Sequence, residues 1–127
     1  MTVTAGSKRI LVVDDEPFLV KINEKRLTGK GYKVTAVTDS IVALEKFRSQ
    51  PDSFDLLITD QTMPGLTGAE LVKAVLELKP SLPVIMCTGH SQAISRKDAM
   101  AIGIKKYVFK PLHGDELLEA VKDVLEL

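Results

Sequence analysis

Short apolar runs without polar interruption are the feature that most constrains the fold of this 127-residue chain. A strand with one buried face alternates apolar and polar residues, whereas a strand buried on both faces is apolar throughout. Three runs are of the second kind: Ile10–Val13, Leu56–Ile58 and Val84–Cys87. They predict a parallel sheet that is covered by helices on both faces.

Five strand-like runs alternate with five stretches of helical spacing, in which apolar residues recur every three or four positions. The expected strands are Arg9–Val13, Tyr32–Val37, Asp55–Thr59, Pro83–Cys87 and Lys106–Phe109. Gly29 is expected to end the first helix. Five β-α units of this kind make a small doubly wound α/β domain.

Serine and aspartate residues mark where two of the helices begin. Asp39 or Ser40 can cap the second helix, and Ser91 can cap the fourth. Asp39, at the end of the second strand, is therefore interpreted as structural. The fourth helix has the weakest apolar pattern, with Ile94, Ala99 and Ile102 as its markers.

The composition excludes several function classes. Seventeen basic and seventeen acidic residues cancel, so no direct contact with nucleic acid or an anionic membrane is expected. No apolar run approaches the ~20 residues that span a bilayer, and the single cysteine, Cys87, suits a reducing cytoplasm. We expect residues 1–7 to be a disordered leader or linker remnant, and residues 8–127 to form one domain.

Polar side chains that carry chemistry follow four of the five expected strands. Asp14 and Asp15 follow the first, Asp60 the third, Thr88 the fourth and Lys110 the fifth. Ligands of such sheets bind beyond the carboxyl ends of the strands. Each residue alone has an ordinary explanation as a turn or helix-start residue, but their coincidence on one edge predicts a site.

The three carboxylates at this edge would repel one another without a cation. Carboxylate and carbonyl oxygens suit Mg²⁺, and neither a thiolate nor a histidine is at these positions to favour zinc or copper. Lys110 would pair with Asp60 at rest and then with a phosphoryl oxygen, and Thr88 can donate a hydrogen bond to another phosphoryl oxygen. Asp60 would act as the nucleophile and form an acyl phosphate.

The residues around these positions resemble the receiver domains of bacterial two-component systems, the chemotaxis-regulator-like response regulators. The resemblance runs from about Lys8 to Leu127. It implies a flavodoxin-like (βα)5 sheet with strand order 2-1-3-4-5. The motifs that carry it are ILVVDDEP (10–17), DLLITDQTMPG (55–65), VIMCTG (84–89) and YVFKP (107–111).

The resemblance also implies a role for each residue of the metal and phosphoryl site. Asp60 is similar to the phosphoacceptor of the family, and Asp14 and Asp15 to its metal-binding acidic pair. The backbone carbonyl of Thr62 would be the remaining protein ligand of Mg²⁺. Thr62 and His90 fall where residues of this family tune dephosphorylation, although His90 is more often a plain loop residue.

The same resemblance implies a conformational switch. Lys110 is similar to the lysine that contacts the phosphoryl group, Thr88 to the switch hydroxyl and Tyr107 to the switch aromatic, whose ring turns inward. A half-buried strand residue is the alternative interpretation of Tyr107. The expected output surface is the fourth helix, fifth strand and fifth helix.

The implied partners are a histidine kinase or phosphotransfer domain, which supplies the phosphoryl group, and an unidentified downstream protein. Such a domain is not an enzyme beyond its own phosphoryl transfer and autodephosphorylation. The sequence is most similar in character to the C-terminal receivers of hybrid sensor histidine kinases. Because the sequence stops right after the fifth expected helix, we expect either a stand-alone receiver or a piece of a longer protein.

Three other classes of protein are alternatives. A magnesium-dependent aspartyl phosphohydrolase has two aspartates spaced by one residue after its first strand, whereas Asp14 and Asp15 are adjacent. A flavin-binding electron carrier needs a first loop that cradles phosphate, and the Asp14-Asp15-Glu16 loop would repel it. An unphosphorylated interaction module is disfavoured because every acidic and lysine position of the motif is present.

Overall fold

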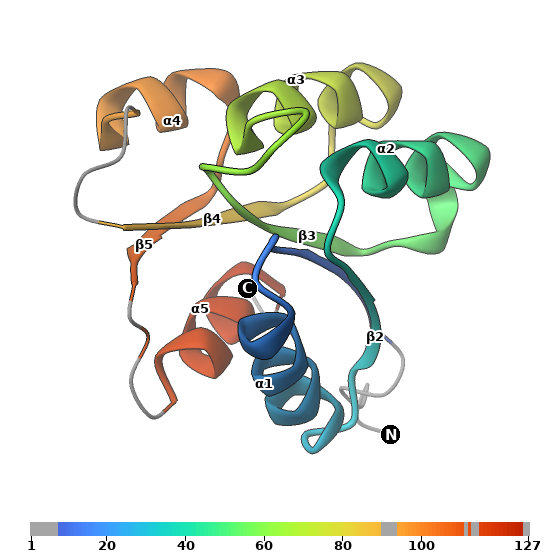
Figure 1. Cartoon of the computed structure of the whole chain (residues 1–127), viewed down its shortest axis with the longest axis vertical. Coiled ribbons are helices and arrows are strands. Elements are labelled where there is room, and N and C mark those ends of the chain that lie inside the picture. Colours follow the sequence, from blue (N-terminus) through green and yellow to red (C-terminus); the bar gives the residue numbers. More distant parts are fainter. Residues whose placement is uncertain (1–7, 90–93, 111, 113–114, 126–127) are drawn as a thin grey trace.

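Five parallel strands form one central sheet between two layers of helices in the computed structural model (Figure 1). The structure describes residues 8–89, 94–110, 112 and 115–125, so the expected leader, Ser91 and His90 lie outside it. None of the helices in the described ranges is long and apolar enough to cross a membrane.

The strands are β1 (Arg9–Val13), β2 (Lys33–Val37), β3 (Leu56–Asp60), β4 (Val84–Thr88) and β5 (Lys106–Phe109). The helices are α1 (Pro17–Thr28), α2 (Ser40–Ser49), the short 3-10 helix η2 (Pro51–Ser53), α3 (Gly68–Leu78), α4 (Arg96–Ile102) and α5 (Glu116–Leu125).

The strand order is β2-β1-β3-β4-β5, which confirms the predicted doubly wound topology. All four neighbouring pairs are parallel. β1 and β3 lie side by side with Val13 opposite Thr59, so the residues that follow β1 come close to the last residue of β3. The carboxyl ends of all five strands therefore meet at one edge.

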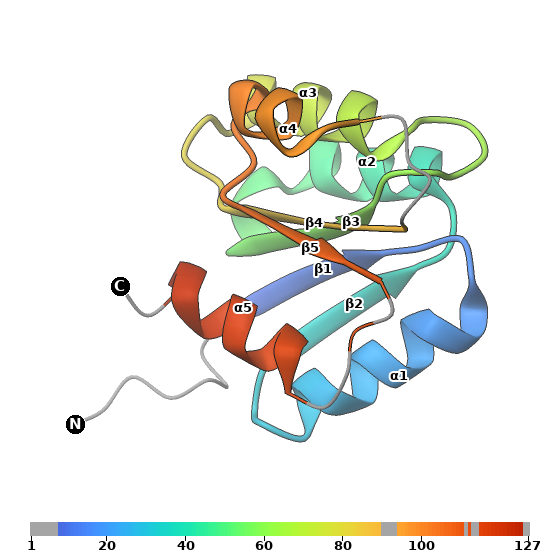
Figure 2. The same cartoon turned by 90° about the vertical axis from the view of Figure 1, so that its left-hand side faces the viewer.

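Alternate residues of the strands divide the core between the two faces of the sheet. Leu11, Leu57 and Met86 pack in the cluster that contains the buried side chains of α2, α3 and α4. Ile10 and Ile85 pack on the opposite face in the cluster of α1 and α5. Figure 2 shows these two helix layers above and below the sheet. Each fully buried aliphatic side chain stabilises the fold by about 1.5–3 kcal/mol.

The helix starts agree with the sequence in one case and correct it in another. Asp39 caps α2, as expected, because its Oδ1 accepts the N–H groups of Ile41 at 2.8 Å and Val42 at 3.1 Å. Ser95, rather than Ser91, caps α4 by accepting the N–H of Asp98 at 3.1 Å. The seven-residue α4 begins at Arg96, later than its apolar pattern suggested, and Ile94 precedes it.

Two strands extend one residue further than predicted. The ladder between β3 and β4 continues to Asp60 opposite Cys87, and that between β4 and β5 continues to Thr88 opposite Phe109. Asp60 and Thr88 are thus the last residues of their strands rather than the first residues of loops. Their backbones are held by the sheet, which gives their side chains a defined direction.

Candidate functional site

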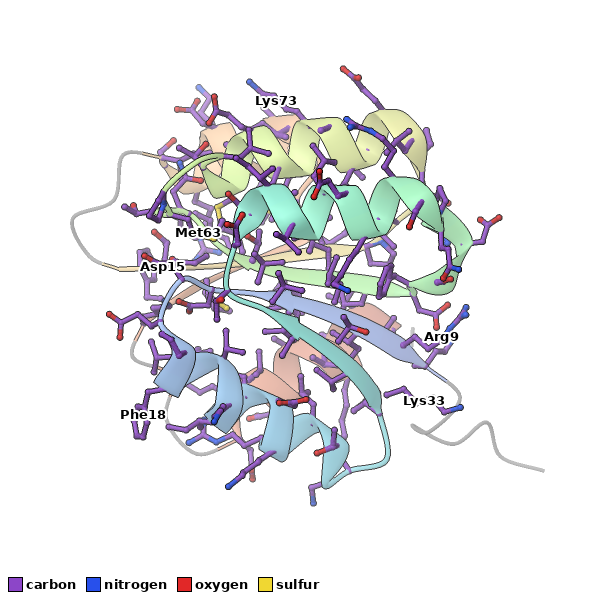
Figure 3. All side chains as sticks on the ribbon, turned by 45° about the vertical axis from the view of Figure 1, so that its right-hand side comes forward. Arg9, Asp15, Phe18, Lys33, Met63 and Lys73 are labelled. Carbon is purple, nitrogen blue, oxygen red and sulfur yellow. The ribbon has the colours of Figure 1, made fainter. Side chains whose placement is uncertain are left out.

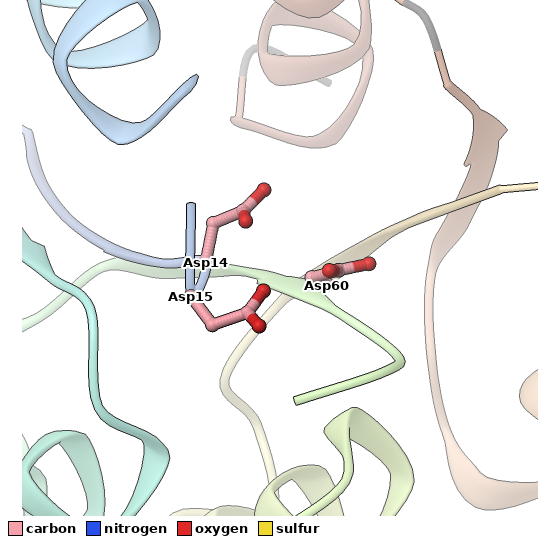
Figure 4. A group of neighbouring side chains, drawn as sticks. All are labelled: Asp14, Asp15 and Asp60. Carbon is pink, nitrogen blue, oxygen red and sulfur yellow. The ribbon is translucent and has the colours of Figure 1, made fainter. Parts of the chain in front are cut away.

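Three carboxylates gather at the carboxyl edge of the sheet. One oxygen from each of Asp14, Asp15 and Asp60 lies within 4.8 Å of the others (Figure 4). Asp14 and Asp60 are 4% and 8% exposed, whereas Asp15 is open to solvent. Asp14 follows β1, and its Oδ1 accepts the N–H of Glu16 at 3.0 Å, which fixes the turn into α1.

Lys110 brings one positive charge into this group. Its Nζ lies 2.6 Å from Asp14 Oδ2 and 3.3 Å from Asp60 Oδ2. The sequence predicted a pair with Asp60, and the structure adds a shorter contact with Asp14. Lys110 follows β5, and its N–H donates to the carbonyl of Thr88 at 2.7 Å, so the ends of β4 and β5 are tied together.

The electrostatics of the cluster follow from burial and from the excess of carboxylates. Burial raises the pKa of Asp60; the charge of Lys110 lowers it, and Asp14 raises it further, so that the net change is upward. Burial lowers the pKa of Lys110, but its hydrogen bond and charge interaction with Asp14, aided by Asp60, raise it overall. Asp60 thus prefers its neutral form more than an exposed aspartate does, and Lys110 stays charged.

Cys87 lies opposite Asp60 in the sheet but belongs to the core. Its side chain packs in the cluster on the α1 and α5 face. Burial raises the pKa of the Cys87 thiol to about 12. The thiol is therefore un-ionised at neutral pH and supplies no thiolate ligand to the site.

Thr88 and Tyr107 are both buried, on neighbouring strands. Thr88 is fully enclosed at the end of β4, and its hydroxyl donates a long hydrogen bond of 3.4 Å to the carbonyl of Gly89. The Tyr107 hydroxyl donates to the carbonyl of Ile94 at 2.7 Å. The Arg96 guanidinium lies 5.4 Å from the centre of the Tyr107 ring. Tyr107 is thus more deeply buried than the alternative interpretation expected, since both its ring and its hydroxyl are enclosed, and its role as a switch stays a prediction.

The segment that follows Asp60 is fastened to the start of α3. The N–H of Gln61 donates to Asp60 Oδ1 at 2.8 Å. In return, the Gln61 carbonyl and Oε1 accept the N–H groups of Gly68 at 2.8 Å and Ala69 at 2.9 Å. A Cβ on Gly68 would lie 2.2 Å from the Asp60 carbonyl oxygen, so only glycine fits there. Sequence analysis did not single out Gln61 or Gly68, because these contacts depend on how the segment folds back.

Thr62 is exposed and lies two residues beyond Asp60, in the 61–67 loop. Its role as a metal ligand stays a prediction. His90 lies outside the described residues.

The donor set fits a hard divalent cation. Three closely spaced carboxylates and the positive charge of Lys110 leave an uncompensated negative charge among the described residues of the site. The main cause of the raised pKa of Asp60 is its burial. Oxygen ligands of this kind suit Mg²⁺, which takes few protein ligands and retains water molecules. Asp15 is exposed, so solvent reaches this side of the cluster.

Comparison with known proteins assigns this fold and site to a class. The sequence profile of the response regulator receiver domain matches residues 10–122. The chain therefore belongs to the receiver domain family of two-component signalling, whose members are phosphoacceptor domains.

The relatives include both short and long proteins. The chemotaxis protein CheY of Treponema pallidum is 34% identical over 132 residues, with 98% of this chain and 91% of CheY covered. The sensor protein EvgS of Escherichia coli is 38% identical over 108 residues, which are 85% of this chain but 9% of EvgS. The chain thus spans nearly all of one relative and a small part of another.

Solved structures share the fold. A response regulator receiver domain protein from Clostridium thermocellum is 29% identical, with a TM-score of 0.88 and 94% of both chains covered. The response regulator TrrA of Thermotoga maritima, solved with Mg²⁺ and a beryllium fluoride, is 36% identical. Its TM-score is 0.81, with 93% of this chain and 99% of TrrA covered.

Proposed function

We propose that Asp60 accepts a phosphoryl group from the phosphohistidine of a histidine kinase or phosphotransfer domain. An Asp60 carboxylate oxygen forms a bond to phosphorus while the bond from phosphorus to the histidine nitrogen breaks, and the imidazole retains the electron pair. The product is an acyl phosphate on Asp60. The observation that carries this proposal is the position of Asp60 beside both Lys110 and the other two carboxylates.

Asp14, Asp15, Asp60 and the backbone carbonyl of Thr62 are the residues that would hold Mg²⁺. The metal, when bound, neutralises negative charge on the transferring phosphoryl group. The bound Mg²⁺ of TrrA supports this assignment. Lys110 is within reach of a second phosphoryl oxygen, since its Nζ is 3.3 Å from Asp60 Oδ2.

The proposed output is a switch through Thr88 and Tyr107. Among the residues that the structure describes, the Thr88 hydroxyl has only a long bond to the Gly89 carbonyl, so little is lost when it turns to a phosphoryl oxygen. Tyr107 connects β5 to the segment before α4 through Ile94, and to the first residue of α4 through Arg96. A change at Thr88 would therefore reach the surface of α4, β5 and α5, where we place the downstream partner. As part of the same proposal, we place the domain in the cytoplasm, as the sequence led us to expect.

Phosphorylation by acetyl phosphate tests the assignment. With Mg²⁺, intact-mass spectrometry should show the addition of one phosphoryl group to the parent protein and none to Asp60→Asn. Asp123→Asn is the matched control. Asp123 is an exposed aspartate of α5 that pairs with Lys106, the first residue of β5, so this variant should be phosphorylated like the parent. Modification of Asp60→Asn at the parent's rate would refute the role of Asp60.

The amount of phosphate released separates a receiver from a hydrolase. The domain acts on its own phosphoryl group, so we expect about one phosphate per chain in a single cycle after the donor is removed. Many turnovers of an added phosphomonoester would instead support the aspartyl phosphohydrolase alternative.

A further inference from the structure

Ser40, the first residue of α2, joins that helix to the loop that follows the phosphoacceptor strand. Its side chain is fully buried. The Ser40 hydroxyl donates to the carbonyl of Pro64 at 3.0 Å and accepts the N–H of Leu66 at 2.9 Å. One hydroxyl therefore satisfies two backbone groups that are 24 and 26 residues away in sequence.

The two hydrogen bonds hold a turn that most residues could not form. Gly65, between the two bonded residues, has a φ of +82°, in the left-handed region that favours glycine. A Cβ on Gly65 would lie 3.2 Å from both the Ser40 hydroxyl and the end of the Ile41 side chain. The loop at Gly65 therefore packs against the first turn of α2. Helix α2 in turn lies beside α3 in both views (Figures 1 and 2).

The other part of this loop has its own anchors. Gln61 is bound to the start of α3, and Met63 is buried in the core beside α2 and α3. Thr62 is exposed and lies between these two buried residues. The path of the backbone at Thr62 therefore depends on Gln61 and Met63 before it and after it, and on Ser40, which fixes the turn just beyond Met63.

We propose that Ser40 is a positioning residue for the metal site, which sets the affinity for Mg²⁺ by holding the 61–67 loop in its binding conformation. The proposal rests on the proposed function, because it takes the Thr62 carbonyl as a metal ligand. Mg²⁺ demands nearly ideal octahedral geometry, so a displaced carbonyl weakens binding more than it would for a larger cation.

The size of the effect follows from the populations of the loop. Without the Ser40 hydroxyl, the Pro64 carbonyl and the Leu66 N–H lose their partner, and other loop conformations become populated. Apparent affinity falls in proportion to the fraction of molecules in the competent conformation. We expect Mg²⁺ affinity to fall about three- to tenfold, which corresponds to about 0.7–1.4 kcal/mol and lies within the net contribution of a single hydrogen bond.

Ser40→Ala tests the proposal, with Ser49→Ala as its matched control. Ser49 is the last residue of α2, is exposed, and donates to the carbonyl of Lys46 within the same helix at 3.0 Å. Mg²⁺ affinity is measured by titration of backbone amide NMR signals, which needs no tryptophan, and the chain has none. Thermal unfolding without metal confirms that each variant is folded at the temperature of the titration.

The expected result is a three- to tenfold weaker affinity for Ser40→Ala, parent affinity for Ser49→Ala, and faster hydrogen exchange at the Leu66 amide in Ser40→Ala alone. Parent affinity in folded Ser40→Ala would overturn the proposal, since Ser40 would then contribute to stability only. If Ser40→Ala does not fold, Ser40→Cys replaces the hydroxyl by a thiol, which is a much weaker donor and acceptor. Mg²⁺ affinity should then also fall in Ser40→Cys, and parent affinity in that variant would overturn the proposal. Absence of Mg²⁺ binding in the parent and in Ser49→Ala would instead reject the proposed function.

Discussion

The carboxyl and amino edges of the sheet differ in how deeply their charged side chains are buried. At the carboxyl edge, three carboxylates gather, and the two that pair with Lys110, Asp14 and Asp60, are buried. At the amino edge, Lys106 Nζ lies 3.0 Å from Asp123 Oδ2, and the two side chains are 41% and 60% exposed. Figure 3 shows Asp15 at one end of the molecule, with Arg9 and Lys33, at the starts of β1 and β2, toward the other.

This difference separates a site from a surface. Exposed pairs of opposite charge contribute at most about 1 kcal/mol and are common on stable proteins. Buried groups of one sign cost stability unless a cation compensates them. The carboxyl edge retains such groups, and perturbed pKa values of this kind gather at functional sites. The predictions below test whether the two edges differ in energy as they do in structure.

Replacing Lys110 should have the largest effect. Lys110→Met keeps the apolar part of the side chain and removes the charge that Asp14 and Asp60 share. We expect a loss of about 3 kcal/mol in the free energy of unfolding at pH 7 without divalent cations, because buried carboxylates are left unpaired. Urea denaturation measures this. A loss no larger than that for Lys106→Met would remove the contrast between the edges.

Mg²⁺ should stabilise the parent protein through the carboxyl edge alone. A ligand at one hundred times its dissociation constant stabilises by about 2.7 kcal/mol. Thermal unfolding with and without Mg²⁺ should show this gain in the parent and in Asp123→Asn, which changes the amino edge. Asp60→Asn should gain clearly less, because it lacks one carboxylate of the cluster. An equal gain in Asp60→Asn would place the bound cation elsewhere.

Asp60→Asn should itself stabilise the metal-free protein modestly at pH 7, because it removes a buried carboxylate charge. The pKa of Asp60 is raised above the ordinary value of 3.8 in the folded state. The folded protein therefore keeps this proton to a higher pH than the unfolded chain, and ionisation of Asp60 destabilises the fold as the pH rises through the raised pKa. The advantage of asparagine should be largest at neutral pH and should shrink on acidification. Urea denaturation at several pH values checks the sign, and an advantage that grows in acid would contradict it.

Lys106→Met should have the smallest effect, below about 1 kcal/mol at low salt. Its pair with Asp123 is exposed, so salt screens it. Unfolding measured at low and high NaCl should show that the difference from the parent fades with salt. The difference between parent and Lys110→Met should persist, because that cluster is largely buried.

Much of the fold could be predicted because burial on both faces leaves a pattern within each strand. The bounds of β1 and β5 match the prediction, and the strand order follows from the family resemblance. The gathering of Asp14, Asp60 and Lys110 also follows from the sequence, since parallel strands end at one edge. The ends of β3 and β4 were missed by one residue because a polar residue resembles a loop residue until its strand partner is known.

Two further differences concern a contact between residues distant in sequence and the start of a short helix. Ser40 was weighed only as a helix cap, yet Asp39 caps α2 and the Ser40 hydroxyl binds backbone groups more than twenty positions away. Nothing in the neighbouring residues distinguishes these two uses of a serine. Ser91 and Ser95 both precede the fourth helix, and seven residues are too few for periodicity to fix its start.

Gly68 has a consequence for how the domain can move. Its α-carbon lies so close to the Asp60 carbonyl that no side chain fits, and its N–H is bonded to Gln61. The start of α3 and the end of β3 therefore shift as one piece, and this half of the site is a fixed support. In the proposed switch, motion that answers phosphorylation would be left to the opposite half, where the Thr88 hydroxyl has a long hydrogen bond to break. The rigid half, formed by the end of β3 and the start of α3, would thus help to set the direction in which the signal leaves the site.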